Sequence, residues 1–234
     1  NFAIEPQELV GIIGPNGAGK TTVFNLITGV YRSTEGSIRL KGKELVGLTP
    51  HQITASGIAR TFQNIRLFKE LSVLDNVRIA HYGQIAYSPV EAFLHIGRFR
   101  AEEKRITDLS LDLLSIFKLD ESANEKAKNL PYGLQRRLEM ARALATGPEL
   151  LLLDEPAAGM NPNEIIQLMD FIRWIRRTFS VTIILIEHQM RLVMGICERL
   201  VVLDFGATIA QGLPSEIQTH PKVLEAYLGV EVAS

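Results

Sequence analysis

A glycine-rich segment near the start of the chain carries the residue types that bind phosphate. It consists of Gly14, Pro15, Asn16, Gly17, Ala18, Gly19, Lys20, Thr21 and Thr22. This spacing matches the phosphate-binding loop of nucleotide-binding proteins, in which glycines let consecutive backbone N–H groups turn toward phosphate oxygens. Lys20 can then reach the β- and γ-phosphates, and the Thr21 hydroxyl can ligate Mg²⁺. The segment therefore predicts a site for ATP or ADP with Mg²⁺.

Two carboxylates follow an apolar run, Leu150–Leu153, later in the chain. Asp154 is expected to hold Mg²⁺ through water, and Glu155 to orient or deprotonate the water that attacks a phosphate. Adjacent acids after an apolar strand are usually a solvated strand end. The phosphate-binding loop in the same chain favours the catalytic interpretation.

Two more polar residues follow predicted strands. His188 comes after Val181–Ile186 and Glu187, and Gln63 comes after Ile58–Phe62. A lone histidine is more often structural than catalytic, but ligands of α/β proteins bind at the carboxyl ends of parallel strands. His188 is therefore a candidate for the same site, whereas Gln63 carries no signal of its own.

Short apolar runs bounded by charged residues indicate the sheet that positions these side chains. Such runs suit a parallel sheet whose two faces are covered by helices. The predicted strands are Leu9–Ile13, Ser37–Leu40, Ile58–Phe62, Leu150–Leu153 and Val181–Ile186, with a terminal hairpin of Arg199–Asp204 and Ala207–Gln211. A helix is expected from Gly19 to Thr28, ended by Gly29.

Capping residues mark where three other helices begin. Thr49 precedes a proline, Ser72 lies three residues before Asp75, and Asn161 precedes both a proline and an acid in the first turn. Hydroxyl and amide side chains at these positions accept hydrogen bonds from free backbone N–H groups. The last of these helices is expected to extend to about Arg177.

The middle of the chain has a helical pattern. The segment Ala101–Phe117 carries Ile106, Leu109, Leu113 and Phe117 at helical spacing, whereas His81–Arg100 predicts only loops and short helices. We therefore expect an α/β P-loop NTPase core with a mainly parallel sheet and an inserted helical subdomain. The single ATP-binding domain covers residues 1–234, with the core in 1–70 and 150–234 and the helical subdomain in about 71–149.

Composition narrows the class of protein. The net charge of −1 provides no global basic field, so no nucleic-acid partner is expected. One cysteine, Cys197, excludes an internal disulfide framework and suits a small buried apolar position. No apolar run reaches the ~20 residues that span a bilayer, so a membrane role would require a partner.

The order of these segments resembles the ATP-binding domain of ABC transporters. The phosphate-binding loop, Gln63, Leu130–Arg137, Leu150–Pro156 and His188 occur in that family's order. The resemblance implies that Gln63 touches Mg²⁺ or water and senses the membrane partner, and that His188 contacts the γ-phosphate. Residues 158–161 take the position of the family's D-loop, with Asn161 where an aspartate is usual.

The resemblance also implies a dimer. The family's signature, normally LSGGQ, completes the ATP site of a second ATPase subunit, and this chain has Leu130, Pro131, Tyr132, Gly133, Leu134 and Gln135 in that position. Gly133 is expected to open a helix from Leu134 to about Leu144, whose N-terminus favours a phosphate. Pro131 removes the signature hydroxyl, which implies weaker contacts across the dimer or an asymmetric heterodimer. The family's adenine-stacking aromatic residue is expected before residue 1.

A narrower resemblance is to the ATP-binding subunits of branched-chain amino acid importers. It rests on residues 130–144, 154–162 and 186–206, and on the ending EAYLG at 225–229. It implies an ATPase at the cytoplasmic face of the membrane, bound to integral-membrane permease subunits and energising solute uptake. The alternatives are another ABC system, such as a lipopolysaccharide exporter, and a soluble ABC ATPase. Residues 64–68 suit either a permease contact or packing beneath the helical subdomain.

Overall fold

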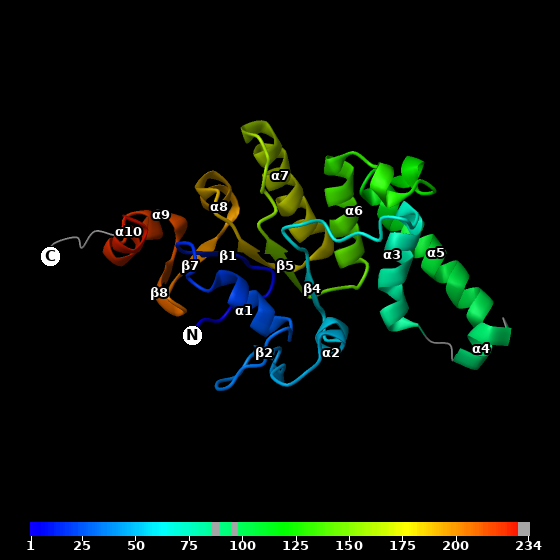
Figure 1. Cartoon of the computed structure of the whole chain (residues 1–234), viewed down its shortest axis with the longest axis horizontal. Coiled ribbons are helices and arrows are strands. Elements are labelled where there is room, and N and C mark those ends of the chain that lie inside the picture. Colours follow the sequence, from blue (N-terminus) through cyan, green and yellow to red (C-terminus); the bar gives the residue numbers. More distant parts are fainter. Residues whose placement is uncertain (86–88, 95–97, 229–234) are drawn as a thin grey trace. The chain divides into compact units, whose positions relative to one another are not determined.

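The computed structural model describes residues 1–85, 89–94 and 98–228. The chain forms two compact units, Asn1–Gln63 with Glu149–Ser234, and Asn64–Pro148. We call them the α/β unit and the helical unit (Figure 1). The sequence prediction placed residues 64–70 in the core and Glu149 in the helical subdomain, whereas the units divide at Gln63 and Pro148.

A six-stranded sheet forms the centre of the α/β unit, in the order β4-β5-β6-β1-β7-β8. The described strands of this sheet pair in parallel, except that β8 pairs antiparallel with β7 at one edge. The predicted α/β fold with a mainly parallel sheet is confirmed. Its strands are β1 (Leu9–Ile13), β4 (Ile58–Arg60), β5 (Leu150–Asp154), β6 (Thr182–Ile186), β7 (Arg199–Asp204) and β8 (Ala207–Gly212).

Helices cover both faces of this sheet, which explains why its central strands are apolar along their whole length. Every residue of β1 and β5 is buried. Helix α1 lies on the face opposite to α7 and α8 (Figure 1), because β1 leads back toward β4 whereas β5 and β6 lead forward, and such crossovers are right-handed. The helices of this unit are α1 (Lys20–Ile27), α2 (Pro50–Ala55), α7 (Pro162–Phe179), α8 (Met190–Ile196), α9 (Pro214–Gln218) and α10 (Pro221–Leu228).

A small hairpin of β2 (Arg39–Leu40) and β3 (Lys43–Glu44) completes the unit. The strand predicted at Ser37–Leu40 is therefore only two residues long, and β4 ends at Arg60 rather than Phe62.

The predicted helix caps are confirmed. Thr49 Oγ1 accepts a hydrogen bond from the Gln52 N–H, and Ser72 Oγ accepts one from Asp75 N–H. Asn161 Oδ1 accepts hydrogen bonds from the N–H groups of Asn163 (3.0 Å) and Glu164 (3.1 Å). Local side-chain chemistry therefore sets these helix starts.

The helical unit contains α3 (Val73–His81), α4 (Pro89–Leu94), α5 (Phe99–Ile116) and α6 (Tyr132–Leu144), with short 3₁₀ turns at Tyr82–Gln84, Asp120–Ser122 and Ala127–Asn129. Part of the stretch predicted as loops and short helices, residues 86–88 and 95–97, lies outside the described residues. Helix α6 begins at Tyr132 with Pro131 as its N-cap, so Gly133 lies in the first turn and does not open the helix as predicted.

One core position of α5 was predicted wrongly. Ile106, Leu113 and Phe117 are buried, but Leu109 is 40% exposed. Ser110 takes the inner position instead, because it lies four residues after Ile106 and three before Leu113. Its hydroxyl donates a 2.7 Å hydrogen bond to the Ile106 carbonyl, so a polar residue is tolerated there.

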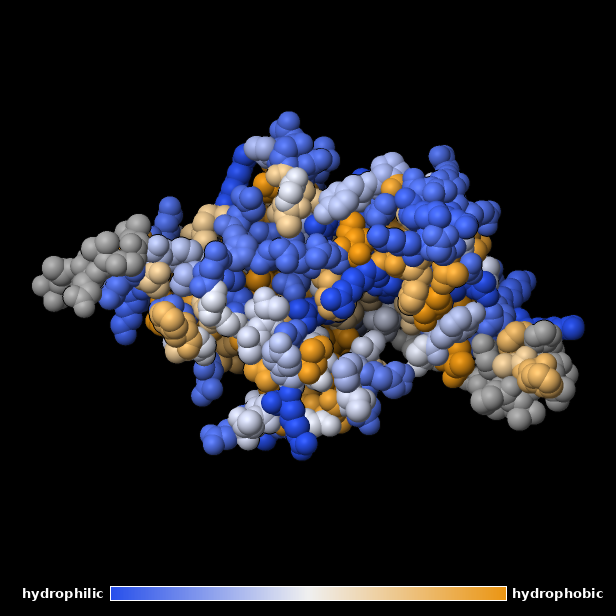
Figure 2. All heavy atoms as spheres, viewed as in Figure 1, coloured by the Kyte–Doolittle hydropathy of each residue, from blue (hydrophilic) through white to orange (hydrophobic). Residues whose placement is uncertain are grey.

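Within the described residues, none of the helices has the length and apolarity to cross a membrane. Hydrophilic residues cover most of the face seen in Figure 2, and hydrophobic ones appear there as separate patches. Cys197 is buried, as predicted.

Candidate nucleotide and catalytic site

The phosphate-binding loop lies between the end of β1 and the start of α1. Lys20, the first residue of α1, is only 6% exposed, and its Nζ donates hydrogen bonds to the carbonyl oxygens of Gly14 (2.8 Å) and Pro15 (2.9 Å). Burial lowers the pKa of the Lys20 ammonium, and the nearby charge of Glu155 partly offsets this. The loop thus encloses a cation at the N-terminus of a helix, an arrangement that favours bound phosphate.

Backbone packing fixes the shape of this loop. At Gly14, which has a φ of 152°, an added Cβ would lie 2.1 Å from the Leu203 carbonyl oxygen of β7. The Gly206 N–H, in the turn between β7 and β8, donates a 3.0 Å hydrogen bond to the Ala18 carbonyl. The neighbouring strand and its turn therefore hold both ends of the loop.

Glu155 lies at the end of β5, and both of its carboxylate oxygens are occupied. Gln63 Nε2 donates a 2.7 Å hydrogen bond to Oε2, and His188 Nε2 lies 2.6 Å from Oε1. Glu155 also has a φ of 45°, which is rare for a residue with a side chain and is often found at functional sites. The structure thus brings together the three residues expected to be catalytic.

Asp154 precedes Glu155 and is buried. Its Oδ2 accepts a 2.6 Å hydrogen bond from Arg60 Nη2 in a buried ion pair. Sequence reasoning missed Arg60, although a charged residue inside the apolar run of a predicted strand was a visible signal.

Glu187 was also missed. Its buried carboxylate accepts hydrogen bonds from three backbone N–H groups, those of Ala157 (2.6 Å), His188 (2.9 Å) and Gln189 (3.2 Å). It therefore ties the segment that follows β5 to the segment that carries His188. The signal in the sequence was an acid between a buried strand and a candidate histidine.

Tyr227 lies on the C-terminal helix α10. Partial burial raises the pKa of its hydroxyl, and the backbone of Gly14 in the phosphate-binding loop lowers it by a smaller amount. Tyr227 belongs to the EAYLG ending, of which residue 229 lies outside the described residues.

The donors available for a metal suit Mg²⁺. Thr21 offers an exposed hydroxyl on α1, and Asp154 a carboxylate at the end of β5. Across the described ranges, no group of three or more His, Cys, Asp or Glu side chains is placed to hold a metal ion. Mg²⁺ needs no such cage, because it binds through one or two protein oxygens, substrate phosphates and water.

The six signature residues lie in the helical unit. Tyr132 and Gly133 are exposed at the start of α6, and the Tyr132 hydroxyl accepts hydrogen bonds from Arg136. Gln135 Nε2 donates to the Leu130 carbonyl (2.8 Å). Helix α6 therefore begins after Pro131 with no side-chain cap hydrogen bond, at the position where the usual signature has a hydroxyl.

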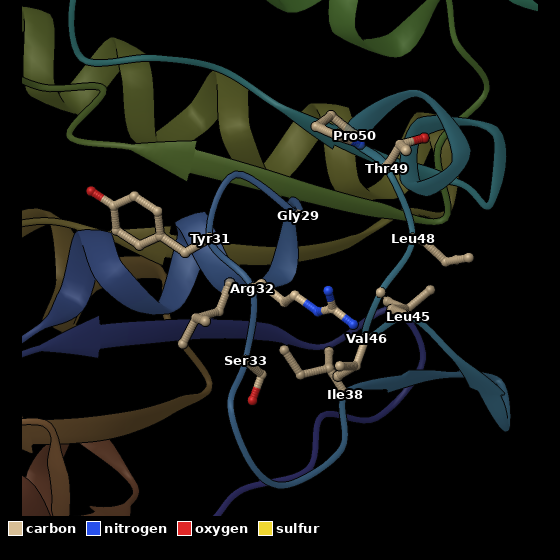
Figure 3. A pocket seen from close by; sticks show the side chains of 12 residues that line it. Gly29, Tyr31, Arg32, Ser33, Ile38, Leu45, Val46, Leu48, Thr49 and Pro50 are labelled. Carbon is tan, nitrogen blue, oxygen red and sulfur yellow. The ribbon is translucent and has the colours of Figure 1, made fainter.

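A cavity of about 280 Å³ lies apart from these residues in the α/β unit. It opens between the end of α1 and residues 45–50. Arg32 points into it toward Leu45 and Val46, while Tyr31 points away (Figure 3). None of its lining residues is a predicted site residue.

Comparison with known proteins identifies the family of this chain. The model of the ABC transporter family matches residues 1–158, and that of "Branched-chain amino acid ATP-binding cassette transporter" matches residues 207–233. The chain belongs to the ATP-binding subunits of the ABC transporter family, an ATP-hydrolysing class, which confirms the resemblance.

The names of related proteins are more specific than the family name. The chain is 46% identical to the high-affinity branched-chain amino acid transport ATP-binding protein LivG of Escherichia coli (strain K12), over 98% of this chain and 90% of LivG. It is 45% identical, with the same coverage, to BraF of Pseudomonas aeruginosa, which has the same description. The lipopolysaccharide export protein LptB of Acidithiobacillus ferridurans is 35% identical over 95% of this chain and 86% of LptB.

A solved structure supports the fold. The ADP conformation of an ATP-binding cassette from an ABC transporter matches with a TM-score of 0.80 and 30% identity, covering 96% of this chain and 89% of the other.

Proposed function

We propose that this chain is the Mg²⁺-dependent ATPase subunit of an importer for branched-chain amino acids. The observation that carries the catalytic part is the Glu155 carboxylate, held between Gln63 and His188 at the end of β5. The substrate class rests on the transport role in the names of LivG and BraF and on the match at residues 207–233. Lipopolysaccharide export has weaker support, at 35% identity.

The phosphate groups of ATP bind the loop and the start of α1. Lys20 exchanges its two carbonyl partners for the β- and γ-phosphates, while the N-terminus of α1 adds its partial charge. Thr21 and Asp154 would hold Mg²⁺, and the bound ion would neutralise negative charge on the phosphates. Phosphoryl transfer depends on such positioning and charge stabilisation more than on covalent help from the protein.

Glu155 acts as the general base for the attacking water. Gln63 Nε2 and His188 Nε2 each contact one oxygen of this carboxylate. A carboxylate offers about four acceptor sites, so each oxygen can still accept a hydrogen bond from water. The His188 side chain is 45% exposed and can turn from Glu155 toward the γ-phosphate.

The remaining partners follow from the same proposal. A second ATPase subunit contributes its signature helix to the ATP site, as α6 of this chain does for that subunit. Integral-membrane permease subunits hold the pair at the cytoplasmic face of the membrane.

Steady-state ATP hydrolysis with Glu155→Gln tests the catalytic part. We expect kcat to fall at least ~100-fold, the size typical of losing a general base, while ATP still binds. The matched control is Glu35→Gln, an exposed carboxylate in a loop of the same unit, which should leave kcat unchanged. A rate insensitive to Glu155→Gln would refute the assignment.

The concentration dependence of the rate tests the dimer. The wild-type rate should rise more than linearly with protein concentration if a second copy completes the site. A linear rise would refute a homodimer. Absence of hydrolysis by the isolated chain would indicate a heterodimer, to be tested with a candidate partner ATPase subunit.

Cells that lack LivG test the substrate class. Expression of this chain, but not of its Glu155→Gln variant, should restore leucine uptake. Expression without restored uptake would count against this substrate class.

A further inference from the structure

Arg60, the last residue of β4, holds its charge inside the α/β unit. Its side chain is 7% exposed. The guanidinium carbon lies 5.4 Å from the centroid of the Phe24 ring and 5.1 Å from that of the Phe62 ring. Contacts with two aromatic faces restrict both the position and the orientation of a planar cation.

The two terminal nitrogens of Arg60 reach two different elements. Nη2 donates to Asp154 Oδ2 at 2.6 Å, at the end of β5. Nη1 donates to Asn25 Oδ1 at 2.7 Å, on α1. Asn25 lies four residues after Thr21, so the two share a face of α1 one turn apart. One guanidinium thus connects the carboxylate and the helix that provide the expected Mg²⁺ ligands.

An apolar residue or a lysine could not replace this contact. Lysine carries a single ammonium on a flexible stem, whereas the arginine fork presents separate donors in a fixed plane. The position also has a cost, because Arg60 Nε is buried without a hydrogen-bond partner. A buried charge that leaves one donor unsatisfied would be hard to explain if its role were only to fill the core.

We propose that Arg60 is a positioning residue for Mg²⁺, holding Asp154 and α1 at the separation that the ion requires. This inference rests on the proposed Mg²⁺-dependent ATPase function. Mg²⁺ tolerates little departure from octahedral geometry at about 2.0–2.1 Å, so its affinity responds strongly to ligand position. Residues that orient metal ligands typically change metal affinity by about 10- to 100-fold when replaced.

The test measures nucleotide affinity without hydrolysis. ADP binding is measured by calorimetry with Mg²⁺ and again with EDTA. The dissociation constant in EDTA divided by that in Mg²⁺ gives the contribution of the metal to ADP affinity. In Arg60→Lys we expect this ratio to fall about tenfold, while ADP affinity in EDTA, which depends on the phosphate-binding loop, changes less than about twofold. Asn25→Ala, which leaves the Asp154 pair intact, should lower the ratio by about threefold and serves if Arg60→Lys does not fold.

The matched control is Arg199→Lys. Arg199 makes a two-pronged ion pair with Glu8 (2.7 and 2.8 Å) elsewhere in the same unit. The Arg199→Lys substitution should leave the ratio of dissociation constants unchanged, even if it lowers the melting temperature.

An unchanged ratio in Arg60→Lys and in Asn25→Ala would overturn the inference, as would an equal fall in Arg199→Lys. A wild-type ratio of one would overturn both the Mg²⁺ requirement and this role of Arg60. A wild-type protein that shows the expected ratios but hydrolyses no ATP, alone or with a candidate partner ATPase subunit, would refute the proposed activity alone and leave the role of Arg60 standing.

Discussion

Two glycines of the phosphate-binding loop should respond very differently to the same substitution. At Gly14 an alanine Cβ would lie 2.1 Å from the Leu203 carbonyl oxygen. At Gly17, with a φ of 82°, nothing lies within 4 Å of an added Cβ. Gly14→Ala therefore combines a collision with an unfavourable backbone conformation, whereas Gly17→Ala has the backbone cost alone.

The collision cannot be relieved cheaply, because the Leu203 carbonyl belongs to the backbone and a Cβ has no rotation that would move it away. Leu203 belongs to β7, whose register is set by pairing with β1, where Ile13 lies opposite Val202. Overpacking typically costs about 1–3 kcal/mol, and a left-handed conformation about 1–2 kcal/mol for a residue with a side chain. We expect Gly14→Ala to lose about 2–5 kcal/mol of unfolding free energy and Gly17→Ala about 1–2 kcal/mol.

Urea denaturation provides the assay. The chain has one tryptophan, Trp174, on α7 of the α/β unit, so its fluorescence reports unfolding of the unit that contains the loop. The Gly14→Ala midpoint should lie clearly below that of Gly17→Ala, with the same slope if only stability has changed. Equal midpoints would refute the argument that β7 constrains the loop.

Two further predictions follow from single residues. Because burial raises the pKa of the Cys197 thiol, it should react with a thiol reagent far more slowly in the folded protein than in urea, and equal rates would contradict its burial. A hydrogen bond to Arg199 lowers the pKa of the Glu8 carboxyl in the folded state, so the pair's stabilisation is present above the unfolded-state pKa and disappears as pH falls through the folded-state pKa. Glu8→Gln should therefore lower stability at pH 7 by up to about 1 kcal/mol, and this difference should vanish in acid thermal melts.

Local features could be predicted from the sequence. The phosphate-binding loop depends on glycines and a lysine within nine consecutive residues, and the capping residues act on N–H groups two or three positions away. The buried strands β1 and β5 were visible as apolar runs because both faces of the sheet are covered. Each of these features depends on residues that are close together in the sequence, so it can be predicted from the sequence without knowledge of the fold.

Contacts between distant segments were decided only by the tertiary structure. Glu155 is 92 residues from Gln63 and 33 from His188, and no pattern along the chain shows that their side chains meet. Arg60 received no prediction, because its contact with Asp154 depends on β4 lying beside β5. The reason is that strand order places the carboxyl ends of β4, β5 and β6 next to one another, and strand order depends on crossovers that no local residue pattern records.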